Sequence, residues 1–141
     1  MITAVNINAT KKYASKHDPS PENPTIFHIG LLDHNLNHYI DDQVTNFEIK
    51  SKNSAEIAKA SYNLSRRNYL AVKFGLKEVE NMTDPETNKP IKFDTVSVPV
   101  GSKNYMAATD RQMSMFSKAL VDELAEVILN ENRLTEDETK N

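Results

Sequence analysis

This chain contains no cysteine, and its three glycines are isolated from one another. The lack of cysteine excludes disulfides and thiolate metal sites. Isolated glycines exclude a glycine-rich loop of the kind that holds phosphate groups. No apolar run approaches the roughly 20 residues of a transmembrane helix. Residues 1–7 lack the basic and long apolar regions of a signal peptide. We therefore expect a soluble protein in a reducing compartment.

Hydrophobic residues are also scarce, at 38% of the 141 residues. Globular domains usually contain about 45–50% of them. The length suits one domain. The low apolar share is compatible with a small core and flexible ends, or with a core that another chain completes.

Charge is distributed unevenly along the chain, although the net charge is only −3. Between Lys50 and Lys77 there are seven lysines and arginines and one acid, Glu56. From Asp110 to Asn141 there are eight acids and four bases. Two solvated helix faces would produce this pattern. Complementary surfaces, within one chain or between neighbouring copies, would also produce it, and such charges set orientation and encounter rate more than affinity.

Hydrophobic periodicity and capping residues predict the elements of the chain. Asp33, Ser54 and Thr109 are expected helix N-caps, and Gln112 completes a capping box with Thr109. Asn88 suits a left-handed turn position, and Val44–Lys50 is ambiguous between strand and helix. The expected strands are 2–7, 25–32, 91–94 and 96–100. The expected helices are 33–43, 54–74 and 110–131. Residues 11–25 are expected to form a polar loop or mobile arm.

A small hairpin is expected in the second half of the chain, with its turn at 101–104 and its second strand through Met106. Pro99 places the first strand of this hairpin at a sheet edge, because proline cannot donate a ladder hydrogen bond. The fold class is thus α+β, a predominantly helical small domain with a short β-hairpin or sheet and a long C-terminal amphipathic helix. We expect an N-terminal strand and flexible arm at 1–24, a globular domain at 25–133 and an acidic tail at 134–141.

The C-terminal helix is the most informative segment. Six apolar residues recur at steps of three and four and form one stripe, while most of the neighbouring acids fall off it. Such a stripe is either the core of the domain or a surface that binds another helix. The stripe consists of Met113, Phe116, Leu120, Leu124, Val127 and Ile128.

Residues with possible chemistry are few. His34 and His38 have the four-residue spacing of a shared metal, but the segment lacks the glutamate base of a zinc hydrolase. Arg66 and Arg67 precede Tyr69, a combination that can bind phosphate and stack on bases. No nucleophile, base and orienting group can be named together. The sequence therefore predicts a protein without enzymatic activity, metal or cofactor.

From Phe74 onward the chain resembles short proteins of the tail gene modules of tailed bacteriophages. The resemblance rests on 74–81, the turn 84–88, 89–93, the final helix and 134–138, and it extends over about half of the chain, Tyr69 to Asn141. Val79 or a shifted residue stands where the family pattern has tryptophan. Met82 stands where the pattern has phenylalanine, and Asn88 where it has a turn glycine.

This resemblance implies a tail assembly chaperone. Such proteins are small, largely helical and non-catalytic, and they bind the long tape-measure protein before the tail-tube subunits polymerise around it. In this family a longer form made by ribosomal frameshifting is common. The implied location is the host bacterial cytoplasm, and the implied partners are the tape-measure protein or other tail proteins. Self-association is an alternative. Membrane and nucleic-acid partners are not expected.

Seven residues are the candidate partner-binding residues: Arg66, Arg67, Met113, Phe116, Leu120, Glu123 and Glu126. Two other functions remain open. One is a structural virion subunit, such as a head–tail connector or tail terminator, that forms a homo-oligomeric ring. The other is a small phage nucleic-acid-binding protein that uses Arg66 and Arg67.

Overall fold

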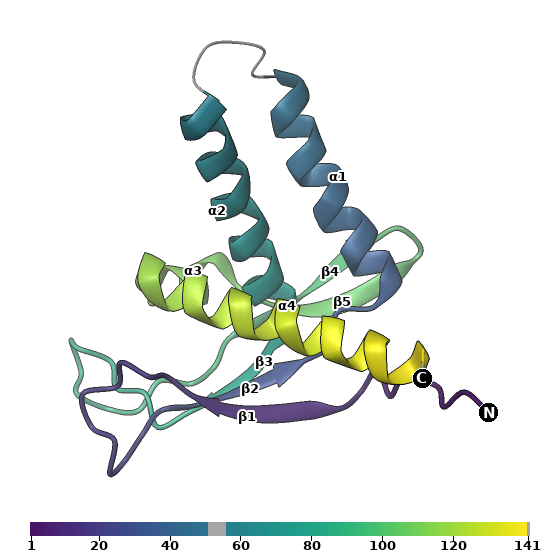
Figure 1. Cartoon of the computed structure of the whole chain (residues 1–141). Coiled ribbons are helices and arrows are strands. Elements are labelled where there is room, and N and C mark those ends of the chain that lie inside the picture. Colours follow the sequence, from purple (N-terminus) through teal and green to yellow (C-terminus); the bar gives the residue numbers. More distant parts are fainter. Residues whose placement is uncertain (51–55, 141) are drawn as a thin grey trace.

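The computed structural model describes residues 1–50 and 56–140, and the side chains of 1–44 and 64–133. It contains both helices and small antiparallel sheets, compatible with the expected α+β class (Figure 1). In chain order the elements are β1 (Thr10–Ala14), β2 (Ile26–Gly30), α1 (His34–Lys50), α2 (Glu56–Gly75), β3 (Leu76–Glu80), β4 (Thr95–Val100), β5 (Lys103–Ala108), α3 (Asp110–Ser114) and α4 (Lys118–Lys140).

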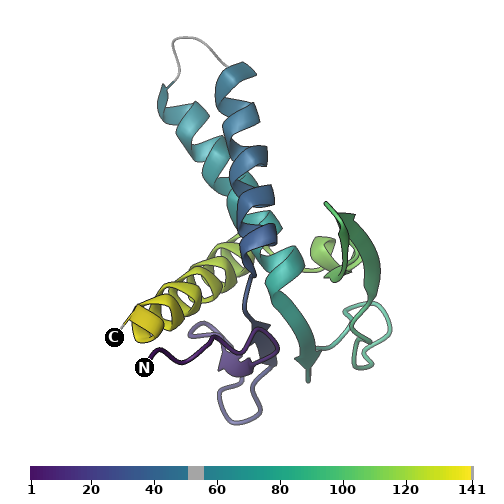
Figure 2. The ribbon, with the colours of Figure 1, turned by 90° about the vertical axis from the view of Figure 1, so that its right-hand side faces the viewer.

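Two sheets form the base of the molecule. Strands β1, β2 and β3 make an antiparallel sheet in that order, and β4 and β5 make a separate hairpin. Helix α4 lies across the three-stranded sheet, whereas α1 and α2 form a helical hairpin that stands away from it (Figure 1). After a quarter turn, the hairpin and the C-terminal end of α4 both project from the body (Figure 2).

The core lies between the three-stranded sheet and the helices. Strand β2 alternates as a half-buried strand should, with Phe27 and Ile29 inside and His28 outside. The Phe27 ring meets the Phe116 ring edge to face, with 6.2 Å between centroids. A Cβ at Gly75 would lie 2.9 Å from Ile128 Cγ2, so only glycine lets the end of α2 approach α4 this closely.

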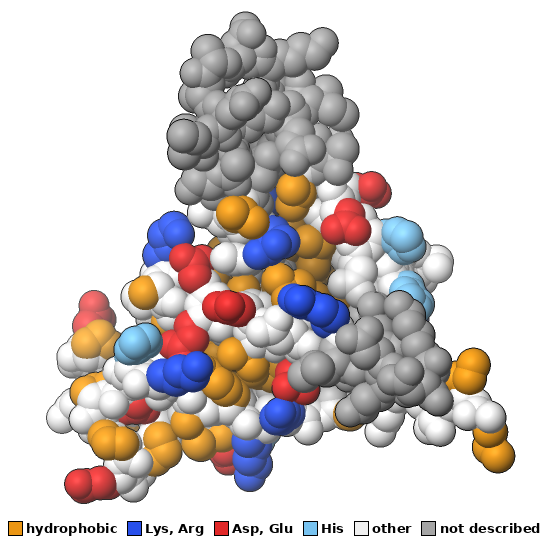
Figure 3. Space-filling model, in the orientation of Figure 1, with side chains coloured by type: hydrophobic (Ala, Val, Ile, Leu, Met, Phe, Trp, Pro, Cys, Tyr) orange, Lys and Arg blue, Asp and Glu red, His pale blue; other side chains and the backbone are white. Residues whose placement is uncertain are grey.

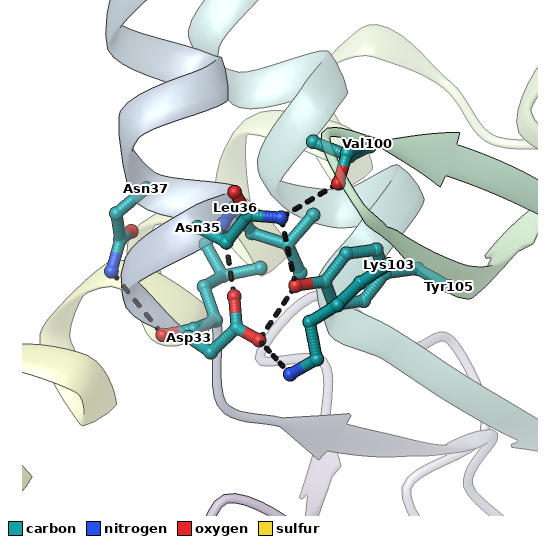
Figure 4. Close-up of polar contacts among 8 residues, drawn as sticks. Asp33, Asn35, Leu36, Asn37, Val100, Lys103 and Tyr105 are labelled. Carbon is teal, nitrogen blue, oxygen red and sulfur yellow. Dashed lines mark hydrogen bonds and ion pairs between the residues drawn. The ribbon is translucent and has the colours of Figure 1, made fainter.

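Helix α1 is fastened to the β4–β5 hairpin by a polar network around its first turn (Figure 4). Asp33 caps the helix, because its Oδ1 accepts from the Leu36 N–H at 2.9 Å. Its Oδ2 accepts from the Tyr105 hydroxyl at 2.7 Å and from Lys103 Nζ at 3.3 Å. Asn35 Nδ2 donates to the Val100 carbonyl at 2.8 Å. These contacts confirm the expected Asp33 cap and hold the base of the helical hairpin against the sheet hairpin.

Several expectations for the N-terminal third are wrong. Residues 2–7 form no strand, and the expected polar arm contains β1, which pairs with β2 along its whole length. Hydrogen bonds also hold the loop that follows β1 in place. Asp18 accepts hydrogen bonds from the Ser20 and Thr25 N–H groups, and Asn81 donates to the Asn23 carbonyl. The three-stranded sheet therefore extends into residues 1–24.

The middle of the chain follows the prediction with two exceptions. The ambiguous segment before Lys50 continues α1, and the strand expected at 25–32 and the hairpin expected at 96–106 are present. Asn88 has the positive φ predicted for it, 57°. Strand β3 was not predicted, and residues 91–94 form no strand. The predicted cap Ser54 lies outside the described residues.

The final helix expected at 110–131 is divided into α3 and α4. Thr109 caps α3 as predicted, because its Oγ1 accepts from the Gln112 N–H at 3.1 Å. The predicted capping box is not formed, because the Gln112 side chain accepts from the Asp94 N–H instead. Ser117 begins α4, with its Oγ accepting from the Leu120 N–H. The backbone of α4 continues to Lys140, so the expected acidic tail is helical for most of its length.

Candidate protein-binding surface

The structure distributes the seven candidate partner-binding residues over four environments. Met113 and Phe116 belong to the core. Leu120 and Glu123 line a cavity beside the β1–β2 loop. Arg66 lies on one face of α2, whereas Arg67 and Glu126 border a groove between α2 and α4. The predicted set is therefore not a single site.

The apolar stripe of the last helix is mainly core, the first of its two possible roles. Leu124 and Ile128 have no exposed surface, and Met113 and Phe116 are buried. These residues belong to one buried cluster with Phe27 and Ile29 of the three-stranded sheet. Met113 and Phe116 are buried in the core of the domain and present little surface to a partner in this structure.

Glu123 links α4 to the end of β1 by hydrogen bonds within the chain. Its carboxylate accepts from the Tyr13 hydroxyl, from Ser15 Oγ at 2.8 Å and from the Lys16 N–H at 3.1 Å. Burial raises the pKa of the Glu123 carboxyl, but these three hydrogen bonds outweigh it and hold the pKa below the ordinary value. Burial and the hydrogen bond to Glu123 raise the pKa of Tyr13 to about 12. Glu123 is thus largely engaged within the chain.

Leu120 lies in a cavity of about 520 Å³ whose floor also includes Phe27 and Met82. The β1–β2 loop and the segment after β3 form its walls. Leu120 is half-buried and lines this hollow.

A groove of about 660 Å³ separates α2 from α4, and we call it the α2–α4 groove. Its apolar residues are Leu64, whose surface is 48% exposed, and the half-buried Leu129. Figure 3 shows this face, with apolar side chains set among charged ones below the hairpin. The charged side chains that line the groove are Arg67, Lys118, Asp122, Glu126 and Arg133.

The rim of the α2–α4 groove is held in place by hydrogen bonds. Asp122 accepts from Lys118 Nζ at 2.8 Å and from Asn68 Nδ2 at 3.0 Å. Arg67 donates to Asn68 Oδ1 at 3.2 Å. The hydrogen bonds from Lys118 and Asn68 lower the pKa of Asp122, so this carboxylate remains charged at neutral pH. The groove thus combines two leucines with charged side chains of both signs.

Of the residues that line this groove, only Arg67 and Glu126 are among the predicted partner-binding residues. Leu64 and Leu129 were not selected, because the groove is formed by two helices far apart in sequence. The periodicity of one helix shows which residues share a face, but not which faces meet.

Other predicted sites have little support in the described residues. His34 and His38 are exposed on α1, and among the described residues no group of three histidine, aspartate or glutamate side chains is placed to hold a metal ion. Within this same part of the chain, no helix is long and apolar enough to span a membrane.

Comparison of the chain with protein-family models, with curated proteins and with solved structures found no match.

Proposed function

We propose that this protein acts without catalysis, by binding another protein, as an assembly chaperone for a phage tape-measure protein in the host bacterial cytoplasm. Two lines of support meet in this proposal. The sequence from Tyr69 onward resembles tail assembly chaperones. The structure adds an open groove between two helices, of the kind that receives a third helix.

The observation that carries the proposal is the pair of leucines in the α2–α4 groove. An amphipathic helix binds such a groove by placing apolar anchors on the floor and its flanking charges against the rim. A tape-measure protein with long amphipathic helices would expose apolar surface until the tail tube surrounds it. Leu64 and Leu129 would cover part of that surface, and the charges at Arg67, Asp122 and Glu126 would set the direction of the bound helix.

The first experiment is co-expression of this chain with the tape-measure protein of the same phage, followed by size-exclusion chromatography with light scattering. We expect a soluble complex, and an insoluble tape-measure protein when it is expressed alone. A discrete ring of this chain by itself, with no complex, would instead support a structural virion subunit.

A substitution then tests the groove itself. Leu64→Glu places a charge on the floor but is tolerated by the fold, because Leu64 is about half exposed, at 48%. We expect the affinity for the tape-measure fragment to fall at least about tenfold, or ~1.4 kcal/mol. Val96→Glu is the matched control, since Val96 is 44% exposed and lies on β4, outside the groove. Equal affinities of the two variants would place the binding surface elsewhere.

A further inference from the structure

A second cleft lies on another face of α2. Consecutive residues of an α-helix are about 100° apart around its axis, so Arg66 turns away from the groove that contains Arg67. Arg66, Tyr69 and Lys73 line a cleft of about 570 Å³ together with Tyr39 of α1 and Val98 of β4. This cleft combines two cations and two phenol groups with apolar walls.

One carboxylate already uses the donors of this cleft. Asp110 Oδ1 accepts from Lys73 Nζ at 2.9 Å and from the Tyr69 hydroxyl at 2.7 Å. The hydrogen bonds from Tyr69 and Lys73, with a contribution from the charge of Arg66, lower the pKa of Asp110. The cleft therefore stabilises a carboxylate at the position where its donors converge.

The two partners of this ion pair differ in exposure. The Lys73 side chain is 15% exposed, whereas the Asp110 side chain is 85% exposed. Lys73 is held in place by its surroundings, including the face of Tyr69, whose ring centroid is 5.8 Å from Nζ. Because Asp110 is largely exposed, an incoming carboxylate can take its place at Lys73 and Tyr69 while Asp110 turns into water, and the Lys73 cation keeps a partner throughout.

The rest of the cleft is lined by Ser65 and by apolar and aromatic side chains. Tyr39 and Phe74 meet edge to face with ring centroids 5.9 Å apart, and Val98 lies opposite them on the sheet hairpin. A volume of about 570 Å³ is larger than one carboxyl group requires. A ligand that fills the cleft therefore carries an acidic group beside an apolar one.

We propose that this cleft binds an acidic side chain and an adjacent apolar side chain of a protein partner, with Asp110 occupying the acid position in the free protein. Charge complementarity is the argument for the partner, because Lys73 Nζ and the Tyr69 hydroxyl already bind a carboxylate at this position. A protein carboxylate is the ligand that reproduces the contacts of Asp110 with Lys73 Nζ at 2.9 Å and with the Tyr69 hydroxyl at 2.7 Å. The proposal does not depend on the tape-measure assignment.

The test is an NMR titration of the whole isotope-labelled protein with a synthetic peptide. The probe is the acetylated sequence LTEDETKN, taken from residues 134–141, which joins a leucine to an acidic run. The control probe replaces its three acids with the corresponding amides. We expect the acidic peptide alone to shift the amides of Tyr69, Lys73 and Asp110.

Four variants locate the binding. Lys73→Met should weaken it about tenfold, because a hydrogen bond to a charged group is lost. Asp110→Asn should strengthen it severalfold, because the competing internal carboxylate is removed. Lys92→Met changes an exposed cation outside both the cleft and the α2–α4 groove and should have no effect. Tyr69→Phe keeps the ring and removes only the hydroxyl, so it provides a milder test if Lys73→Met fails to fold.

Equal shifts with the acidic and amide peptides would overturn the proposal, as would weaker binding by Asp110→Asn. Larger shifts of the same amides with a single-stranded oligonucleotide would also overturn it and would favour nucleic acid. Leu64→Glu should leave peptide binding intact, so failure of the α2–α4 groove and failure of this cleft are distinguishable. Light scattering with and without Lys73→Met then shows whether the acidic segment of a second copy is the natural occupant.

Discussion

At the scale of single residues, Glu123 and Glu126 show how neighbouring acids acquire different roles. Both lie on α4, three residues apart, and both were candidate partner-binding residues. Glu123 accepts three hydrogen bonds from β1 and the residues after it. Glu126 is exposed at the rim of the α2–α4 groove. Only Glu126 is free to meet a partner without loss of an internal contact that the structure describes.

We predict that Glu123→Gln destabilises the fold. The neutral amide cannot accept the three hydrogen bonds as strongly as the carboxylate does, and the loss should be about 1–2 kcal/mol in the free energy of unfolding. Urea denaturation measures it. Glu126→Gln is the control and should change that free energy by less than about 0.5 kcal/mol. Equal effects of the two substitutions would show that the contact between β1 and α4 contributes nothing to stability.

At the scale of elements, α4 is both the main core helix and one wall of the α2–α4 groove. Leu124 and Ile128 point to the sheet and α2, while Leu129 and Glu126 border the groove. The 3.6-residue period of the sequence identified the buried side correctly. It did not show where α3 ends, because the apolar stripe continues through Phe116 while the backbone bends at 115–117. Ser117, a good N-cap residue, was the available signal for the start of α4.

Substitutions on α4 distinguish core from cavity. Leu124→Asp should unfold the domain, because it buries an unpaired charge at a position with 0% exposure. Leu120→Asp should cost much less, because Leu120 is half-buried beside a hollow that water can enter. Far-ultraviolet circular dichroism and thermal melting measure both. A folded Leu124→Asp variant with an unchanged melting temperature would contradict the assignment of this stripe to the core.

At the scale of the whole molecule, carboxylates join elements that are distant in sequence. Asp33 connects α1 to β5, Asp122 connects α4 to α2, and Glu123 connects α4 to the end of β1. Burial raises the pKa of Asp33, but hydrogen bonds from Leu36, Tyr105 and Lys103 outweigh it, so that its pKa is lowered. The pKa values of Asp122 and Glu123 are lowered as well.

Acid should therefore weaken the whole fold. A carboxylate whose pKa is lower in the folded state stabilises the protein above its unfolded pKa, and this stabilisation disappears as the pH falls through the folded pKa. The ordinary values are 3.8 for Asp33 and Asp122 and 4.5 for Glu123. We expect the melting temperature to decline as the pH falls below about 4. Calorimetry from pH 6 to pH 2.5 would measure this, and a melting temperature that is constant or rises toward acid would contradict it.

The sequence alone determined the local features of this protein. Side-chain chemistry acts over a few residues in the Asp33 and Thr109 caps, in the left-handed Asn88 and in the hairpin turn at Gly101. The period likewise predicted most of the buried stripe and where helices occur, although not the end of α1 or the break between α3 and α4. For the same reason, Pro99 could be placed in an edge strand before any partner strand was known.

Only the tertiary structure decided which surfaces meet. β1 is lysine-rich and polar, a composition that protects a sheet edge and resembles that of a loop, so its pairing with β2 had no local signal. β3 follows α2 directly, with no separate turn signal. The α2–α4 groove and the cleft lined by Tyr69 and Lys73 each combine residues from distant segments. Arg66 and Arg67 lie on two different faces of α2. Packing between elements depends on long-range contacts, and no local pattern specifies them.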